Sequence, residues 1–176
     1  MRRKLLSYLS IVSLLFVFAC NQTDVTDPNE KNDKGSLKVV VEKKEYQKLE
    51  TLRKTGKGVS DPFTIEKVEI EKDSLAITVS YLGAVSFWGT KLEHSFTLCW
   101  SGEVQIMIYP MIANLILTHE DNGYSGNTKY IETLMFSLKD LGINDSKDYI
   151  FNVFSDLNST DKPDDSSDGS NISNKP

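Results

Sequence analysis

The sequence predicts an all-β fold, specifically an immunoglobulin-like antiparallel β-sandwich of about seven to eight strands with at most one short helix. Short segments rich in β-branched and aromatic residues recur roughly every ten residues, and turn-forming residues separate them. The chain also lacks the regular alternation of strands and helices that a parallel sheet requires. A small β-barrel fits the same pattern and is the alternative architecture.

The first strands are expected at residues 37–42, 63–70 and 75–82, which are short and rich in β-branched residues. In the third of these, apolar residues alternate with small or polar ones, which predicts one buried face. Those apolar residues are Leu75, Ile77, Val79 and Tyr81. In the second segment the alternation slips between Ile65 and Val68, which predicts a β-bulge there.

Further strands are expected at residues 94–100, 114–118, 130–138 and 149–154. The first of these places four large residues on one side, His94, Phe96, Leu98 and Trp100. Residues 42–54 predict one short helix, because Tyr46, Leu49 and Leu52 recur about one helical turn apart. Residues 137–142 predict a strand end followed by a single turn that stops at Gly142.

Residues 1–19 have the pattern of a secretory signal peptide, because Arg2, Arg3 and Lys4 precede an apolar stretch. That stretch is shorter than the roughly 20 residues that cross a bilayer as a helix. It ends in Val17-Phe18-Ala19-Cys20, which resembles the lipobox of bacterial lipoproteins and implies that Cys20 is acylated. An ordinary signal peptide that contains a cysteine is the alternative. Each buried methylene contributes about 0.8 kcal/mol, so several chains on Cys20 would anchor the protein almost permanently.

Residues 20–35 read as a flexible tether and residues 158–176 as a disordered acidic tail. Both contain few apolar residues and therefore bury too little surface to offset the entropy of ordering. The adjacent carboxylates Asp164 and Asp165 fall in this tail, where no pocket is expected to shift their pKa values. Residues 36–157 remain as a single β-sandwich domain.

Composition argues against two classes of function. The net charge of -5 includes the cations of the signal peptide, so the mature chain is more acidic still and a nucleic-acid partner is not expected. Motifs for a serine hydrolase, a phosphate-binding loop, a zincin helix or an EF-hand loop are not present in the sequence. We therefore expect a protein that is not an enzyme and needs no cofactor.

Cys99 is expected to be a buried, unreactive thiol. If Cys20 is acylated, no other cysteine remains to pair with it. Its neighbours Leu98 and Trp100 place it in the interior of a strand, where a thiol behaves as a small hydrophobe.

His94 and His119 are the candidate metal ligands. They would lie at the same end of the domain if their strands pair, and Glu93, Glu120 or Asp121 would then be third ligands. The simpler interpretation, which we favour, is that each histidine caps a strand end and hydrogen-bonds a turn. On that interpretation the domain binds zinc only weakly.

Phe87 and Trp88 are the candidate ligand-binding residues. They lie in a connection, residues 83–89, that mixes glycine with large aromatics. Exposed, they would anchor a peptide or a sugar ring. We expect instead that both rings fold over the open end of the core. Tyr109-Pro110 is expected at a sheet edge or at a crossing between sheets.

Residues 63–141 resemble a group of small, uncharacterised lipoproteins of the Bacteroidota. The resemblance rests on loose motifs, among them Gly89 before Glu93-His94-Ser95-Phe96, then Trp100-Ser101-Gly102, Leu115-Ile116-Leu117-Thr118-His119 and Leu134-Met135-Phe136-Ser137-Leu138. Members of the group typically carry two cysteines where this chain has Lys91 and Gly126. The resemblance implies the cellular address and the fold, and it implies no activity.

These observations predict a lipid-anchored protein of the cell envelope, in the outer membrane, that acts as a binding or protein-interaction module. Its partner would be an envelope protein or a glycan. A structural envelope component would bury Phe87 and Trp88, whereas a weak metal-binding protein would bring His94 and His119 together. Scattered acidic residues of the tether, Asp24, Asp27 and Glu30, point to outward display.

Overall fold

The computed structural model describes residues 36–104 and 109–164. The chain divides into two units, residues 1–31 and 32–176, and all described residues belong to the second. The expected signal peptide and the whole of the expected tether, including Cys20, lie outside the described residues. The elements are β1 (Leu37–Val41), α1 (Lys43–Lys54), β2 (Phe63–Glu71), β3 (Ser74–Gly83), β4 (Ser95–Trp100), β5 (Met111–Glu120), β6 (Thr128–Ser137), the 3-10 helix η1 (Ser146–Asp148) and β7 (Tyr149–Ser155).

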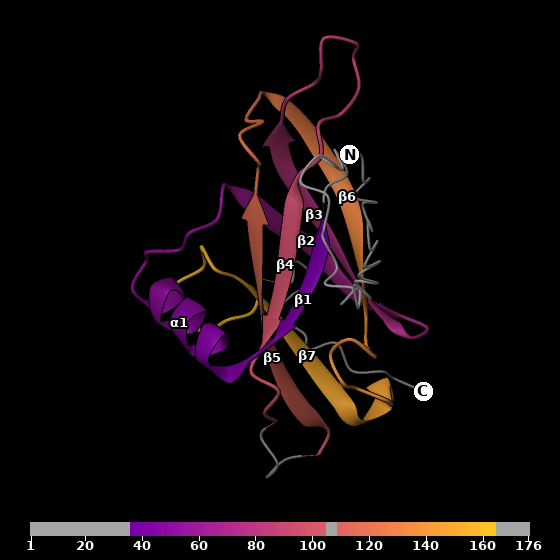
Figure 1. Ribbon diagram of the computed structural model, residues 1–176. Coiled ribbons are helices and arrows are strands. Elements are labelled where there is room, and N and C mark those ends of the chain that lie inside the picture. Colours follow the sequence, from indigo (N-terminus) through magenta and orange to yellow (C-terminus); the bar gives the residue numbers. More distant parts are fainter. Residues whose placement is uncertain (1–35, 105–108, 165–176) are drawn as a thin grey trace, which may run out of the picture. The chain divides into compact units, whose positions relative to one another are not determined.

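The described strands form a β-sandwich, which confirms the predicted fold class (Figure 1). One sheet has the order β1-β4-β5-β7 and the other the order β2-β3-β6. The pairing departs from a wholly antiparallel sandwich, because β1 pairs with β4, and β5 with β7, in parallel. A short hairpin makes neighbouring strands antiparallel. The chain between β1 and β4, and that between β5 and β7, instead passes through the other sheet, so the two strands of each pair can run in the same direction.

The core lies between the inner faces of the two sheets. The alternation predicted for β3 is confirmed, since Leu75, Ile77 and Val79 are fully buried. Opposite them, Leu115 and Leu117 of β5 are also fully buried. The register between β2 and β3 shifts between Ile65 and Lys67, so the predicted bulge is present. It keeps the apolar residues on both sides of the slip directed into the core.

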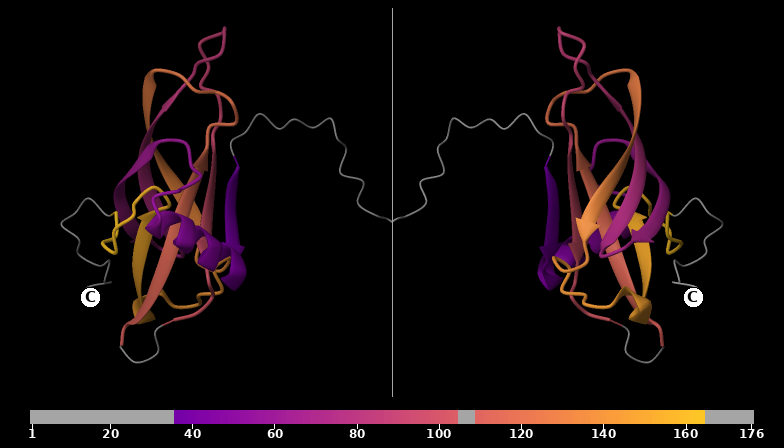
Figure 2. Two further views of the ribbon diagram at one scale, coloured as in Figure 1. Left: turned by 90° about the vertical axis from the view of Figure 1, so that its left-hand side faces the viewer. Right: turned by 90° about the vertical axis from the view of Figure 1, so that its right-hand side faces the viewer.

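The helix α1 covers the outer face of the four-stranded sheet (Figures 1 and 2). Its N-cap is Glu42, whose carboxylate accepts hydrogen bonds from the backbone N–H groups of Lys44 and Glu45, at 3.1 and 2.7 Å. Leu49 packs with Cys99 and Ile116 in a small second cluster beneath the helix.

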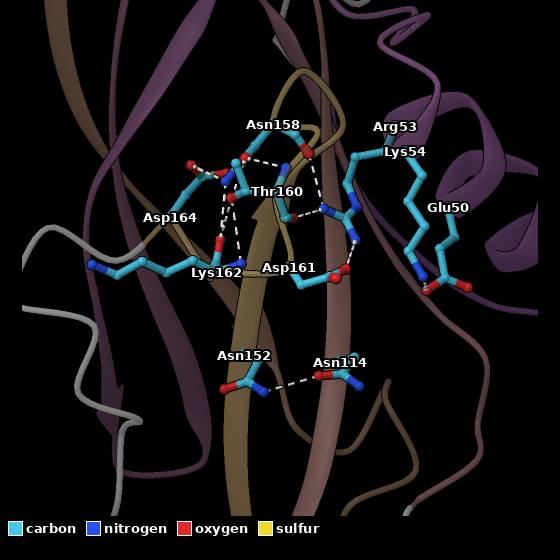
Figure 3. A network of polar contacts seen from close by, with 10 residues as sticks. All are labelled: Glu50, Arg53, Lys54, Asn114, Asn152, Asn158, Thr160, Asp161, Lys162 and Asp164. Atoms are coloured by element: carbon cyan, nitrogen blue, oxygen red, sulfur yellow. Dashed lines mark hydrogen bonds and ion pairs between the residues drawn. The ribbon is translucent and has the colours of Figure 1, made fainter.

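The folded domain continues past its predicted end at residue 157. The Arg53 guanidinium donates to the backbone carbonyl of Asn158 at 2.9 Å and to that of Thr160 (Figure 3). Asp164 accepts from the backbone N–H of Ser155 at 2.6 Å. Residues 158–164 are therefore placed by long-range contacts that their own composition does not reveal, and the remainder of the predicted tail lies outside the described residues.

Asp164 also departs from the expectation of an unperturbed carboxylate. Burial raises its pKa, while hydrogen bonds from the Ser155 N–H and the Asn158 side chain act in the opposite direction. The carboxylate has this environment because the last described residues fold back against β7.

Several strand ends meet at one end of the sandwich. The end of β3 pairs with the start of β6, and the start of β4 pairs with the end of β5. The connections of residues 84–94 and 121–127 therefore lie at the same end, and the first of them extends beyond the strands (Figures 1 and 2).

Candidate functional site

The connection from β3 to β4, residues 84–94, is called the aromatic loop below. At its tip, the backbone N–H of Ser86 donates to the carbonyl of Thr90 at 2.7 Å, and that of Gly89 donates to the carbonyl of Ser86 at 2.9 Å. The Ser86 hydroxyl oxygen accepts from the N–H groups of Trp88 and Thr90, at 3.2 and 3.1 Å. Gly89 has a φ of 76°, which glycine adopts without strain. The tip is thus a closed turn with its own hydrogen bonds.

Phe87 and Trp88 project from this tip into solvent, with 93% and 85% of their surface exposed. The expectation that they fold over the core is wrong, because the stem of the loop carries both residues beyond the ends of the strands. The two rings contact each other edge to face, with centroids 5.3 Å apart and planes at 86°. They form an aromatic pair, joined by this ring contact and carried on the hydrogen-bonded turn.

The stem of the loop is a short hairpin. Val85 and Lys91 pair as an antiparallel bridge, and the backbone N–H of Leu92 donates to the carbonyl of Ala84 at 3.3 Å. The backbone N–H of Ala84 donates in turn to the carbonyl of Tyr124 in the neighbouring connection, at 3.0 Å. The stem is therefore fastened both to itself and to the loop beside it.

Lys91 ties the stem to the sandwich. Its Nζ lies 2.7 Å from Oε2 of Glu132 in β6, and the hydroxyl of Tyr81 in β3 donates to the same oxygen at 2.7 Å. The ammonium also lies 5.8 Å from the centroid of the Tyr81 ring and 5.7 Å from that of Tyr130. We call Lys91, Glu132 and Tyr81 the lysine clasp.

The electrostatics of the clasp favour its bonded state at neutral pH. Burial, together with the smaller effect of the hydrogen bond to Glu132, raises the pKa of Tyr81 to about 12. Burial also opposes ionisation of Glu132, but its bonds with Lys91 and Tyr81 outweigh burial and lower the pKa of this carboxyl. Burial lowers the pKa of Lys91, but the contacts with Glu132 and Tyr81 outweigh it, so the pKa is raised overall. The carboxylate, the ammonium and the neutral phenol therefore coexist.

At the base of the loop, the structure brings His94 and His119 into direct contact. Nδ1 of His94 lies 2.8 Å from Nε2 of His119, and the two rings are nearly parallel, at 13°. Both residues are buried, with 4% and 1% of their surface exposed. The His119 ring also stacks on Phe96, with centroids 4.6 Å apart. We call His94 and His119 the histidine pair.

The hydrogen-bond partners determine where the protons of the pair lie. Nδ1 of His119 is 3.1 Å from the backbone carbonyl of Asp61, which only accepts, so this nitrogen carries a proton. Nε2 of His119 is then the acceptor for the Nδ1 proton of His94. Nε2 of His94 is left without a hydrogen-bond partner among the described residues. Burial lowers the pKa of both imidazoles, and the adjacent His119 lowers that of His94 further.

This arrangement differs from both interpretations of the histidines. They do not each cap a separate turn, because they bond each other and only His119 reaches a connecting segment. As metal ligands, their facing nitrogens lie at hydrogen-bond distance rather than converging on a third point. Among the described residues, no group of three or more His, Cys, Asp or Glu side chains is placed to hold a metal ion.

Lys91 and Gly126 occupy the positions where the resemblance implies cysteines. Lys91 belongs to the clasp, and Gly126 packs directly against the backbone of Gly83 and Ala84, so closely that a Cβ at this position would overlap them. In this chain an ion pair therefore ties the aromatic loop to β6, and a close backbone contact joins the loop to the connection of residues 121–127.

A concave region of about 420 Å³ lies between α1 and the outer face of the four-stranded sheet. Cys99 lies on its floor beside Thr97 and Thr118, but the thiol is free and buried. Burial raises its pKa to about 11, with smaller contributions from Glu45 and Glu42. A thiol with this pKa is protonated at neutral pH and is a poor nucleophile.

Sequence reasoning missed the polar residues that order the site and the end of the domain. Glu132 pairs with Val79 on the inner side of β6, and the buried position predicted for Tyr81 does not reveal that its hydroxyl donates to this carboxylate. Arg53 falls four residues after Leu49 on the buried side of α1. That spacing is the one available signal, since a residue at this position lies on the same helix face as Leu49.

Comparison with known proteins assigns no family. No protein-family model and no curated protein matches the chain. Among solved structures, it is similar to a NigD-like immunity protein from Bacteroides caccae, with 13% sequence identity and a TM-score of 0.42. The match covers 79% of this chain, which spans 57% of that protein. Among the described residues, no helix has the length and apolar character needed to span a membrane.

Proposed function

We propose that this chain is a lipid-anchored, non-enzymatic binding module of the cell envelope that contacts a partner protein through its aromatic loop. The observation that carries the proposal is the exposure of Phe87 and Trp88, at 93% and 85%, on a loop whose backbone is fastened at its tip, stem and base. Large exposed aromatics on an ordered support are typical of the residues that dominate binding energy at interfaces.

The physical reasoning has two parts. Burying a Phe or Trp side chain in a partner removes about 150–250 Å² of largely apolar surface from water, which favours association. An ordered loop also loses little conformational freedom on binding, so less of that gain is offset. A purely structural envelope component would bury these two aromatic rings, whereas here both are exposed to water.

The geometry of the pair favours a protein over a glycan as the partner. A sugar ring stacks on a flat aromatic face, whereas Phe87 and Trp88 meet edge to face at the tip of a projecting turn. A projecting apolar group of this kind fits a concave apolar pocket, which protein partners provide.

The test is site-specific photo-cross-linking of the full-length, lipidated protein in its own cells. A photoreactive phenylalanine replaces Phe87, and the matched control carries it at Ile131 of β6, which is 67% exposed. We expect a discrete protein adduct from position 87, none from position 131, and loss of the adduct when Trp88→Ala is added. Equal labelling from both positions, labelling of glycan alone, or an adduct that survives Trp88→Ala would contradict the proposal.

The membrane anchor is a separate part of the proposal and rests on the lipobox-like segment that ends at Cys20. Cys20→Ser is expected to abolish labelling by a fatty-acid probe and to move the protein from the membrane to the soluble fraction. Cys99→Ser is the matched control and should change neither result. Unchanged labelling and fractionation of the Cys20→Ser protein would refute the anchor while leaving the aromatic loop proposal intact.

A further inference from the structure

The His94 ring lies between the two ends of the aromatic loop. His94 is the last residue of the loop, and its Nε2 points at Gly83, the residue from which the loop departs. A Cβ added to Gly83 would lie 2.8 Å from Nε2 and 3.1 Å from Cε1 of His94, so the imidazole packs directly against the backbone there. Tyr81 closes the other side of the ring, with centroids 4.6 Å apart. The imidazole therefore fills the space between the two ends of the loop and contacts both of them.

The histidine pair accommodates two protons and has no place for a third. One proton points from His119 to the Asp61 carbonyl and the other joins the two rings. A third proton would lie on Nε2 of His94, where Gly83 offers a CH₂ group and the described residues offer no acceptor. A buried cation without an acceptor is strongly disfavoured, and moving the ring into water relieves it.

We propose that the histidine pair is a proton-sensitive latch, which holds the two ends of the aromatic loop together while both imidazoles are neutral and releases them when a third proton binds. The latch concerns the conformation of the loop itself, so it stands or falls independently of the partner proposed above.

The groups around the pair do not supply a counter-ion in contact with it. The Asp61 carboxylate accepts from the backbone N–H of Asp121 at 2.8 Å, and the Asp156 carboxylate accepts from those of Val59 and Ser60. The titratable groups that face the pair, by element, are Lys91 of the loop, Asp61 before β2, Tyr81 of β3, Asp121 after β5, Tyr130 and Glu132 of β6, and Asp156 after β7.

The direction of the pH effect follows from linkage. In the closed loop the pKa of each imidazole is below its ordinary value of 6.5, whereas in an open loop His94 is solvated and returns toward that value. The latch is therefore closed above pH 6.5 and opens progressively as the pH falls from there toward the lowered pKa. The open fraction grows by up to about tenfold for each unit that separates the closed and open pKa values.

The experiment is an NMR titration of the full chain from about pH 7.5 to pH 5, a range in which only imidazoles have ordinary pKa values. The sequence contains two histidines, so the spectrum holds two sets of imidazole signals, and the His94→Gln variant identifies which set belongs to His94. Glu132 stays ionised throughout, because its pKa lies below the ordinary 4.5, and the lysine clasp does not titrate. We expect loop amides, such as those of Ser86, Gly89 and Leu92, to shift and to lose protection with the histidine midpoint, while Val79 and Leu134 in the sandwich do not.

Two variants sharpen the test. His94→Gln keeps a side-chain donor for Nε2 of His119 but takes up no proton, so the loop response should disappear. Glu93→Gln removes a neighbouring charge and should leave the response unchanged. The latch is rejected if the loop amides are unaffected while the imidazoles titrate, or if all amides of the domain change together. The titration of the unmodified chain decides the matter even if His94→Gln fails to fold.

Discussion

Arg53 is a charged side chain with only 3% of its surface exposed, and its Nε has no hydrogen-bond partner among the described residues, so its placement depends on the bonds of the rest of the guanidinium. Its guanidinium donates to the carbonyls of Asn158 and Thr160, lies 4.5 Å over the Phe154 ring, and approaches Asp161 at 3.9 Å (Figure 3). These contacts join α1 to the segment after β7. The residue thus contributes to the fold by fastening a stretch of chain that has little apolar surface of its own.

Arg53→Met is expected to destabilise the domain by about 2 kcal/mol, because methionine keeps an apolar stem but removes the donor to the part-buried carbonyl groups of Asn158 and Thr160. The measurement is urea unfolding at neutral pH. Lys54→Met is the control, since Lys54 is exposed and forms only a surface ion pair with Glu50 at 2.9 Å. We expect that variant to change the free energy of unfolding by less than about 0.5 kcal/mol. Similar decreases in the free energy of unfolding for the two variants would show that the contacts of Arg53 do not stabilise the domain.

The Cys99 thiol is expected to react with a thiol reagent only when the domain opens. Burial raises its pKa to about 11, so at pH 7 the thiolate is a very small fraction, and the side chain is 1% exposed. In a Cys20→Ser chain, where Cys99 is the remaining cysteine, labelling at neutral pH should be slow and should accelerate sharply in urea. Rapid labelling of the native protein would mean that α1 readily separates from the sheet.

At the scale of the element, the aromatic loop shows how a polar clasp orders an exposed apolar group. A loop that carries Phe87 and Trp88 in water has no core of its own, so its order depends on backbone hydrogen bonds and on the link from Lys91 to Glu132. The clasp and the histidine pair lie at the stem and the base, and they titrate in different ranges. Histidine protonation begins below pH 6.5, whereas the Glu132 contribution is present above its ordinary pKa of 4.5 and is lost as the pH falls through its lowered value.

Lys91→Met is expected to loosen the aromatic loop while leaving the sandwich intact, because methionine retains the apolar stem but removes the ion pair with Glu132. Backbone ¹⁵N relaxation should show increased motion across residues 85–91. The free energy of unfolding should fall by no more than about 1 kcal/mol, as expected for a partly exposed pair. Lys129→Met, an exposed lysine of β6, is the control and should leave loop motion unchanged. An equally rigid loop in the Lys91→Met protein would show that the clasp is dispensable.

At the scale of the molecule, the C-terminal end of the folded domain is defined by the contacts of residues 158–164, which are expected to contribute to the free energy of unfolding, and not by the polar composition of this segment. A chain that ends at Leu157 is expected to be less stable than one that ends at Asp164 by about 2 to 3 kcal/mol, because the shorter chain lacks the carbonyl acceptors of Arg53 and the Asp164 carboxylate that accepts from Ser155. Urea unfolding of the two chains measures the difference.

The same comparison tests whether Arg53 acts through this segment. In the chain that ends at Leu157, Arg53→Met should have a much smaller effect than in the longer chain, since the two changes remove the same contacts. Additive losses would show that Arg53 stabilises the domain in another way, for example through the Phe154 ring alone.

Strand positions, the bulge after Ile65 and the helix before residue 55 follow from the sequence alone, because each depends on a local alternation of apolar and polar residues and on nearby turn formers. The buried face of β3 and the burial of Cys99 follow in the same way. The membrane anchor at Cys20 likewise remains a prediction from sequence alone, since it lies outside the described residues.

Only the tertiary structure decides what depends on contacts between distant residues. The sequence contains both histidines, but their contact joins residues 25 apart and depends on the pairing of β4 with β5. The contact of Arg53 with Asn158 spans 105 residues, so composition alone misplaced the end of the domain. The exposure of Phe87 and Trp88 depends on how far the stem of the loop continues beyond the strands. Local patterns determine which face of a strand is apolar, whereas packing and long-range hydrogen bonds determine which faces and ends meet.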